Sequence, residues 1–222
     1  IARLVDAGIT GIVINVHHLH PQITAFVREQ NYPIDVITRY EETILGTGGA
    51  IKNVADFLGD APFIVINSDI VTDIDLNAVC AFHERHPHPA TLVIHDYPEF
   101  NNVWVNGDGH IIAFSQDPPP GSDDLECRAF TGIQILDPVI FNFIPDNQFF
   151  SSIDAFREMI GSGLRLAAYS VSGHYWRDIG TPESFFEAVY DKTAPGAFEN
   201  AFNLKSPGCI DRTALSGDGS DR

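Results

Sequence analysis

The chain has 222 residues, of which 44% are apolar, and its formal net charge is −17. This length fits one domain with a tail, and the apolar fraction is sufficient for a buried core, which excludes a disordered chain. The negative charge argues against a nucleic-acid partner that is held through its phosphates. An acidic chain that handles phosphate groups needs metal ions or local positive elements to offset its own field, so the charge also hints at divalent cations.

Cysteine usage and hydropathy bear on the cellular compartment. The three cysteines are scattered and form no CxxC pair, which argues against a disulfide framework or a zinc knuckle and favours a reducing compartment. No apolar run approaches the roughly 18 residues that span a bilayer, and no signal peptide opens the chain. We therefore expect a cytoplasmic protein without a membrane partner.

Short apolar runs alternate with helical patterns over the first hundred residues. This alternation predicts βαβ units, and hence an α/β fold with a mostly parallel sheet that is buried on both faces. A helical pattern already begins at Ile1, so we expect the chain to start inside a domain. Strands are expected at residues 11–16, 34–39, 63–67 and 90–94, and helices at residues 21–30, 49–58 and 76–86.

The pattern changes after Asp96. Two apolar runs flank Asn106-Gly107-Asp108-Gly109, which predicts an inserted β-hairpin with strands at 103–105 and 110–114. Beyond Lys192 the composition is typical of a linker. The sequence thus predicts one domain at residues 1–192 and a linker and tail at 193–222. Further strands are expected at residues 130–136 and 164–171, and helices at 151–160 and 182–190.

A glycine-rich run, Leu45-Gly46-Thr47-Gly48-Gly49, lies between an expected strand and an expected helix. Glycines there allow backbone N–H groups to approach a ligand, and the following helix N-terminus favours electron-rich groups. A tight turn that needs positive φ is the alternative. The run is neither a Walker loop, since no Gly-Lys-Ser/Thr follows, nor a GxGxxG loop.

Two aspartates stand out. Asp69 follows an apolar strand run, and ligands gather at the carboxyl ends of parallel strands, where a carboxylate is suited to Mg²⁺. Its alternative role is a turn or cap. Asp178 precedes Gly180 and Thr181-Pro182, which fit the N-cap and first residue of a helix. The helix cap accounts for Gly180-Thr181-Pro182. It gives no structural reason for Asp178, which therefore stays a candidate site residue.

Histidines crowd two places, one around residues 17–20 and one around residues 83–88. Both sets could mimic metal ligands. Neither has carboxylates nearby in the sequence that would orient such ligands. We interpret both sets as solvated or packing side chains.

In order and spacing, these motifs resemble those of the sugar-1-phosphate nucleotidyltransferases. The similarity rests on the glycine-rich run, Asn67-Ser68-Asp69, Phe130-Thr131-Gly132, and residues 175–181, Tyr-Trp-Arg-Asp-Ile-Gly-Thr. It is closest to the bacterial group that contains N-acetylmuramate-1-phosphate uridylyltransferase and mannose-1-phosphate guanylyltransferase-like proteins, and it covers residues 1–192. The family implies a Rossmann-like, three-layer fold and Mg²⁺-dependent transfer of a nucleotidyl group from a nucleoside triphosphate to a sugar 1-phosphate, which gives an NDP-sugar and pyrophosphate.

The resemblance also implies residue roles. Asp69 and Asp178 would be the catalytic residues and the Mg²⁺ ligands, while the backbone of Thr131 and Gly132 would line the sugar pocket. The base and the sugar stay open, because both depend on pocket shape. The nucleotide would be contacted by Leu45, Gly46, Thr47, Gly48 and Gly49.

The chain departs from the family pattern at two places. Family members open with a strand and a glycine-rich loop whose Arg and Lys grip the triphosphate, and nothing of that kind precedes Ile1. We therefore expect a fragment with impaired activity. Where the family often has Glu-Lys-Pro, this chain has Gln116-Asp117-Pro118, so the Lys contact to the sugar phosphate has no counterpart.

Two other classes of function stay open. One is a non-catalytic module that binds nucleotide-sugars or regulates, which measured turnover would distinguish from an enzyme. The other is a metal-dependent glycosyltransferase. Such enzymes usually carry Asp-x-Asp at the strand end, where this chain has Asn67-Ser68-Asp69.

The last residues, 214–222, resemble the glycine-rich strand-turn that opens aminoglycoside-phosphotransferase-like kinases. A fused or partner sugar kinase would make the sugar 1-phosphate that a nucleotidyltransferase consumes. A polar tail without a fold of its own is the alternative.

Overall fold

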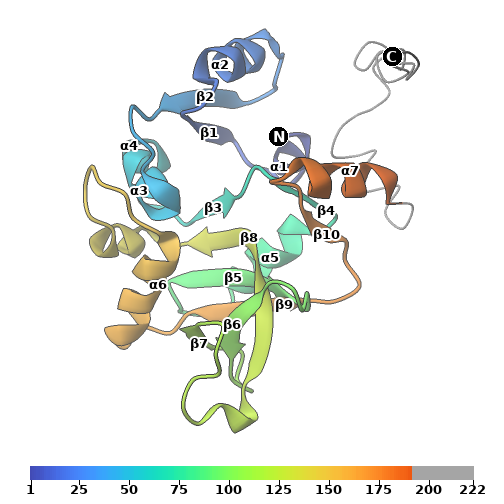
Figure 1. The fold of residues 1–222 in the computed structure, drawn as a ribbon. Helices are drawn as coiled ribbons and strands as arrows, with labels where there is room; N and C mark the ends of the chain where they lie inside the picture. Colours follow the sequence, from blue (N-terminus) through green and yellow to red (C-terminus); the bar gives the residue numbers. More distant parts are fainter. Residues whose placement is uncertain (192–222) are drawn as a thin grey trace, which may run out of the picture. The chain divides into compact units, whose positions relative to one another are not determined.

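A computed structural model describes residues 1–191 of the chain, which divides into two units. The first unit comprises Ile1–Ser68 and Ile74–His174, and the second comprises Asp69–Asp73 and the chain from Tyr175 onward. Figure 1 shows the elements in chain order. The tail at 193–222, with its kinase-like start, lies outside the described residues.

The first unit begins with a βαβ arrangement, as the sequence predicts. Helix α1 (Ala2–Asp6) leads into β1 (Gly11–Val16), α2 (His20–Glu29) and β2 (Asp35–Tyr40). β1 and β2 pair in parallel, and α2 packs against β2. Within the described residues these two strands form a sheet of their own.

The helix expected at residues 49–58 is two helices, and it begins earlier. The first is α3 (Gly46–Asn53) and the second is α4 (Ala55–Leu58), which precedes β3 (Phe63–Ile66). Val54 separates the helices because its backbone leaves the helical region, with φ at −114° and ψ at 13°. The single-helix prediction was therefore wrong at both its start and its middle.

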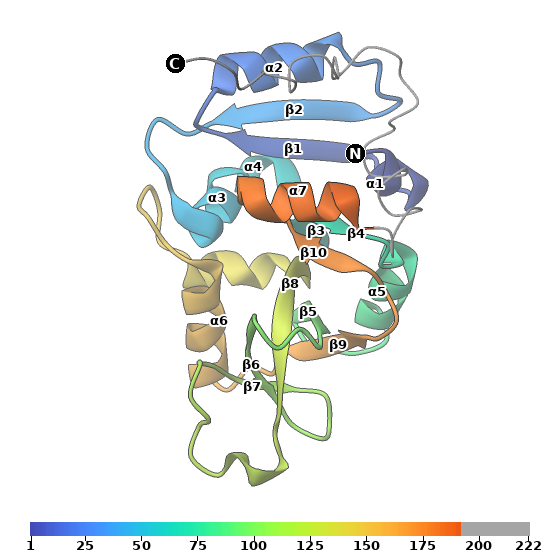
Figure 2. The same ribbon diagram turned by 45° about the vertical axis from the view of Figure 1, so that its right-hand side comes forward.

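A six-stranded sheet forms the body of the first unit, with the order β7-β6-β8-β5-β9 and with β3 also paired to β8. Helices α5 (Leu76–His83) and α6 (Ser152–Gly161) lie on opposite faces of this sheet (Figure 2). Short 3₁₀ helices occupy Ser122–Asp124 and Pro138–Phe143. The strands are β5 (Ala90–His95), β6 (Asn101–Val105), β7 (Ile111–Phe114), β8 (Glu126–Leu136) and β9 (Ala167–Val171).

The main core lies between this sheet and α6. Leu92 and Leu136 from the sheet are fully buried there against Phe156 and Met159 of the helix. Because side chains alternate along a strand, Thr91 and Val93 point to the other face, where Thr91 contacts the end of α5. The sheet is thus buried on both faces, as its continuous apolar strands predict.

The α/β class and the inserted hairpin are confirmed, but the sheet is mixed rather than mostly parallel. Only β1–β2 and β5–β9 are parallel pairs among the described strands. The reason is β8, which follows the β6–β7 hairpin, pairs with β6, and runs antiparallel between β3 and β5. Neighbouring parallel strands need a helical crossover, whereas a strand that returns from a hairpin enters antiparallel.

The second unit contains a small antiparallel pair of strands and one helix. β4 (Ile70–Thr72) pairs with β10 (Trp176–Asp178), and α7 (Pro182–Tyr190) follows. Thr181 caps α7 in a capping box with Pro182 at the first position, as expected. Val71 is buried against Tyr175 and Ile179. The sequence did not predict β4 or β10, since three residues show no periodicity.

No helix in residues 1–191 is long and apolar enough to cross a membrane.

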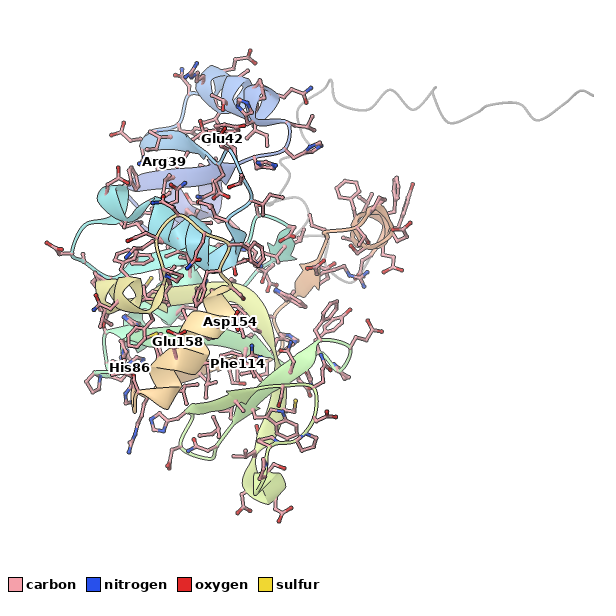
Figure 3. All side chains as sticks on the ribbon, turned by 60° about the vertical axis from the view of Figure 1, so that its left-hand side comes forward. Arg39, Glu42, His86, Phe114, Asp154 and Glu158 are labelled. Carbon is pink, nitrogen blue, oxygen red and sulfur yellow. The ribbon has the colours of Figure 1, made fainter. Side chains whose placement is uncertain are left out.

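The side chains of His83 and His86, at and just after the end of α5, have packing roles, as expected. His83 is buried, with Nε2 3.3 Å from Asp137 Oδ1 and Nδ1 2.9 Å from Thr91 Oγ1. The same hydroxyl lies 2.9 Å from Nε2 of His86, which Figure 3 labels. The N–H of His88 donates to His86 Nδ1, so that nitrogen carries no proton. A chain of hydrogen-bonded side chains thus runs from His86 through Thr91 and His83 to Asp137.

Burial lowers the pKa of His86 below its ordinary value of 6.5, and the nearby His83 and His88 add to this shift. Burial, His110 and Arg165 likewise lower the pKa of His88. Between the lowered pKa and 6.5 the unfolded chain binds more protons than the folded chain, so stability rises with pH in this window.

We therefore expect the Tm to fall as the pH drops from about 7.5 to about 5.5, through the ordinary histidine pKa. Replacing His86→Gln should flatten this pH dependence, because Gln can keep both hydrogen bonds without titrating. Scanning calorimetry across the pH range measures the effect. The matched variant His18→Gln, at an exposed position, should keep the wild-type slope. An unchanged slope in His86→Gln would assign the pH dependence to other groups.

Candidate active site

The glycine-rich run is helical. α3 begins at Gly46, which has a φ of 71°, and Gly48 and Gly49 are buried in its first turns. The N–H groups of Gly48 and Gly49 both donate to the carbonyl of Phe150, at 2.9 and 3.1 Å. The N–H of Phe150 donates in return to the carbonyl of Leu45 at 2.8 Å. The run is thus bonded to the segment that leads into α6.

Glycine is required here by the close approach of two backbones. A Cβ on Gly48 would lie 2.9 Å from the carbonyl carbon of Ser151, and a Cβ on Gly49 would lie 2.8 Å from the carbonyl oxygen of Gln148. Both distances are shorter than real Cβ contacts, and a backbone atom cannot rotate away. The turn alternative, with its positive φ, thus holds for Gly46, while close backbone packing accounts for Gly48 and Gly49. The nucleotide contacts of this run stay a prediction.

The side chain of Thr47 also bonds the start of α3 to the start of α6. Its hydroxyl lies 3.0 Å from Ser152 Oγ and accepts the N–H of Ser152 at 2.9 Å. A Cβ on Gly46 would lie 2.7 Å from the Phe150 carbonyl. The start of α3 is thereby fixed from two sides.

A buried carboxylate that the sequence analysis missed, Glu41, is bonded to the first residue of the glycine-rich run. Glu41 is 7% exposed, accepts from Asn15 Nδ2 at 2.8 Å, and accepts the N–H of Leu45 at 3.2 Å. Asn15 also donates to the carbonyl of Ala50 at 3.1 Å. Together Glu41 and Asn15 bond both ends of residues 45–50. An Asn inside the apolar strand run of β1 was the signal that could have revealed this network.

The motif Phe130-Thr131-Gly132 meets Asn67 in the first unit. The hydroxyl of Thr131 is fully buried and donates to the carbonyl of Val93 at 2.8 Å. Gly132 has a φ of 80°, and a Cβ there would lie 2.8 Å from the Asn67 side chain. The N–H of Asn67 donates to the Gly132 carbonyl at 3.0 Å. Two of the predicted motifs are thus joined by backbone bonding.

Asp69 and Asp178 come together in the second unit, although 109 positions separate them in the sequence. β10 pairs with β4 so that Asp178 lies opposite Ile70, and the N–H of Ile179 donates to the Asp69 carbonyl at 2.7 Å. Asp178 Oδ1 accepts the N–H of Gly180 at 2.9 Å. A Cβ on Gly180 would lie 3.2 Å from both Asp69 Oδ2 and Asp178 Oδ1. The two carboxylates therefore converge on the space beside Gly180.

This donor set fits a hard divalent cation. Mg²⁺ binds through one or two carboxylates and takes its other ligands from phosphates and water. No group of three His, Cys, Asp or Glu side chains within residues 1–191 is arranged to hold a metal. Three or more protein side chains are needed for ions that are held by protein ligands alone. Two carboxylates suffice for Mg²⁺, because phosphates and water provide its other ligands.

Residues 1–194 match the protein family described as nucleotidyl transferase. The chain belongs to this family. It is 26% identical over 200 residues to the UTP–glucose-1-phosphate uridylyltransferase of Synechocystis sp. This match covers 82% of this chain and 51% of the relative. It is 27% identical over 195 residues to the mannose-1-phosphate guanyltransferase of Aspergillus oryzae, which covers 85% of this chain and 53% of the relative. The chain thus spans about half the length of these curated nucleotidyl transferases.

Solved structures confirm the fold of the chain. HddC from Yersinia pseudotuberculosis, in complex with GMP-PN, matches with a TM-score of 0.67 at 21% identity, over 84% of this chain and 80% of HddC. The inositol-1-phosphate CTP transferase of T. maritima matches with a TM-score of 0.68 at 12% identity, over 87% and 81%. These structures bear out the Rossmann-like α/β architecture.

We expect Gly48→Ala to destabilise the chain by about 1–3 kcal/mol, because overpacking against the Ser151 backbone outweighs the ~1 kcal/mol that Ala gains in a helix. Gly161→Ala, in α6, is the matched control, since a Cβ there meets nothing within 4 Å. That variant should be neutral or slightly stabilised. Urea denaturation measures both, and equal stabilities would contradict the packing role of Gly48.

We expect Glu41→Gln to lower the free energy of unfolding by about 1–3 kcal/mol, because Asn15 and Leu45 donate to different carboxylate oxygens and an amide replaces one of these acceptors by an NH₂ donor. Amide hydrogen exchange should speed up over residues 45–50. The control is Glu42→Gln, at the exposed neighbouring position labelled in Figure 3. Unchanged exchange in Glu41→Gln would show that the carboxylate does not hold this run.

Proposed function

We propose that the protein transfers a nucleotidyl group from a nucleoside triphosphate to a sugar 1-phosphate with the help of Mg²⁺, which gives an NDP-sugar and pyrophosphate. The observation that carries this proposal is the convergence of Asp69 and Asp178 beside Gly180. Membership of the nucleotidyl transferase family supports it. So do the names of the relatives, which include uridylyl- and guanyltransferases of glucose 1-phosphate and mannose 1-phosphate.

The reaction is an in-line displacement at phosphorus. An oxygen of the sugar phosphate forms a new bond to the α-phosphorus, while the bond from that phosphorus to the pyrophosphate oxygen breaks. Little covalent help is needed from the protein, so catalysis consists of alignment and charge neutralisation. When bound, Mg²⁺ would screen the two anions and stabilise the charge that develops on the phosphoryl oxygens.

In this proposal Asp69 and Asp178 hold the metal through one carboxylate oxygen each. The antiparallel pairing of β4 and β10 supports their role, because it fixes both backbones before any ligand binds. Gly180 has no Cβ, and a Cβ there would lie 3.2 Å from an oxygen of each carboxylate, so glycine leaves the space between them open. The hydrogen bond from its N–H also orients the Asp178 carboxylate.

The other assignments are part of the same proposal. Residues 45–49 would contact the nucleotide, and the backbone at Thr131 and Gly132 would contact the sugar. The bonding of residues 45–50 to Glu41 and Asn15 supports a pre-organised binding element. A domain at residues 1–192, a cytoplasmic location and a sugar kinase that supplies the sugar 1-phosphate also stay predictions.

We expect Asp69→Ala and Asp178→Ala to reduce kcat at least ~100-fold while the far-ultraviolet circular dichroism stays unchanged, because each removes a carboxylate that neutralises polyphosphate charge. The assay follows pyrophosphate release by the full product of the gene, over a panel of nucleoside triphosphates and sugar 1-phosphates. Near-normal kcat in either variant would refute the metal assignment.

Asp73→Ala is the matched control in the same unit. Asp73 Oδ1 accepts the N–H of Tyr175, so this variant should lose stability and keep kcat. Absence of pyrophosphate release with every substrate pair, together with tight binding of an NDP-sugar, would instead identify a binding or regulatory module. Turnover of an NDP-sugar with an acceptor sugar would identify a glycosyltransferase.

A further inference from the structure

Two histidines on different elements of the first unit face each other. His88 lies in the segment after α5, and His110 lies at the end of the hairpin turn between β6 and β7. Their Nε2 atoms are 3.1 Å apart, and their rings are nearly perpendicular, at 87°. Both residues belong to the first unit and lie outside the predicted nucleotide, sugar and metal residues.

The distance between the two nitrogens suits a shared metal ion. Zinc binds imidazole nitrogen at about 2.0–2.1 Å, so two ligands lie about 3.3 Å apart at a tetrahedral angle and about 2.9 Å apart at a right angle. The observed separation falls between these two values. Imidazole is also the ligand that zinc, copper and nickel prefer among protein side chains of intermediate softness.

The backbone segment that carries each histidine is held by hydrogen bonds before any ion binds. The N–H of His88 donates to His86 Nδ1, and His86 is bonded in turn to Thr91 of β5. The hairpin turn that carries His110 is bonded to β9, since the N–H of Ala168 donates to the Gly109 carbonyl at 2.9 Å. A site on rigid elements loses little entropy when it binds.

We propose that His88 and His110 form a binding site for a divalent transition-metal ion such as Zn²⁺, with both Nε2 atoms as ligands. No third His, Cys, Asp or Glu within residues 1–191 completes the set, so water or an external ligand occupies the remaining positions. A groove of about 290 Å³ lies beside His110.

Two charged residues line that groove. Asp108 attracts a cation and Arg165 repels it, so their effects oppose each other. The net charge of −17 favours cations at long range. A bound ion would link the β6–β7 turn to the segment after α5, and this inference is independent of nucleotidyl transfer.

The test uses the untagged chain after treatment with a chelator. Zn²⁺ is titrated by calorimetry in an excess of Mg²⁺, which occupies the oxygen ligands of Asp69 and Asp178. We expect one saturable site, and a Tm that rises with the Zn²⁺ concentration because the ion binds the folded state. His88→Gln and His110→Gln should each weaken binding by more than the ~10-fold that loss of an outer-shell partner costs. The matched control His18→Gln, at an exposed histidine, should bind as the wild type does.

A second measurement does not depend on whether the variants fold. Electron paramagnetic resonance of the wild-type chain with one equivalent of Cu²⁺ should show hyperfine coupling to two imidazole nitrogens. Coupling to fewer than two nitrogens would overturn the proposal. So would unweakened Zn²⁺ binding in folded His88→Gln or His110→Gln, or an equal loss of binding in His18→Gln.

Discussion

Strand β8 is hydrogen-bonded to three other strands, and the arrangement of the first unit depends on it. β5 pairs along its length, while β3 and β6 share its other edge, β3 at residues 133–136 and β6 at residues 126–129. Every residue from Thr131 to Leu136 is buried. Because side chains alternate along a strand, a shift of one residue in β8 would move its apolar residues to the wrong face of the sheet. The register of β8 therefore fixes Gly132 next to Asn67.

The sequence predicted which helices and strands form better than it predicted which strands pair with one another. Alternation of strands and helices was sufficient for the α/β class, and Asn106-Gly107-Asp108-Gly109 was sufficient for the hairpin. The entry of β8 between β3 and β5 could not be predicted, since strand pairing is non-local and no local pattern names the partner. β4 and β10 escaped prediction because three residues are too few to show a period of two. The break at Val54 could not be predicted because neither Gly nor Pro stands there to signal it.

The glycine-rich run shows the limit of motif reasoning. The sequence indicates that small residues are needed at positions 48 and 49. Two different physical causes select glycine at such positions. A ligand and a second backbone both exclude a Cβ. In the structure the second backbone is present, at residues 148–152, and it accepts both N–H groups. A ligand contact by this run must therefore use atoms other than those two N–H groups, whereas Glu41, which the sequence analysis missed, determines where the run begins.

The approach of Asp69 and Asp178 is a consequence of register alone. Three residue pairs between β4 and β10 place Asp178 opposite Ile70, and the bond from Ile179 to the Asp69 carbonyl extends this pairing by one step. Two carboxylates held at one place repel each other, and this repulsion opposes folding of the strand pair. A divalent cation would convert the repulsion into two attractions, since each carboxylate would then face a positive charge. In the proposed site the same cation would provide the positive charge that a chain of net charge −17 needs to hold a polyphosphate, so local stability and substrate binding would both depend on one ion.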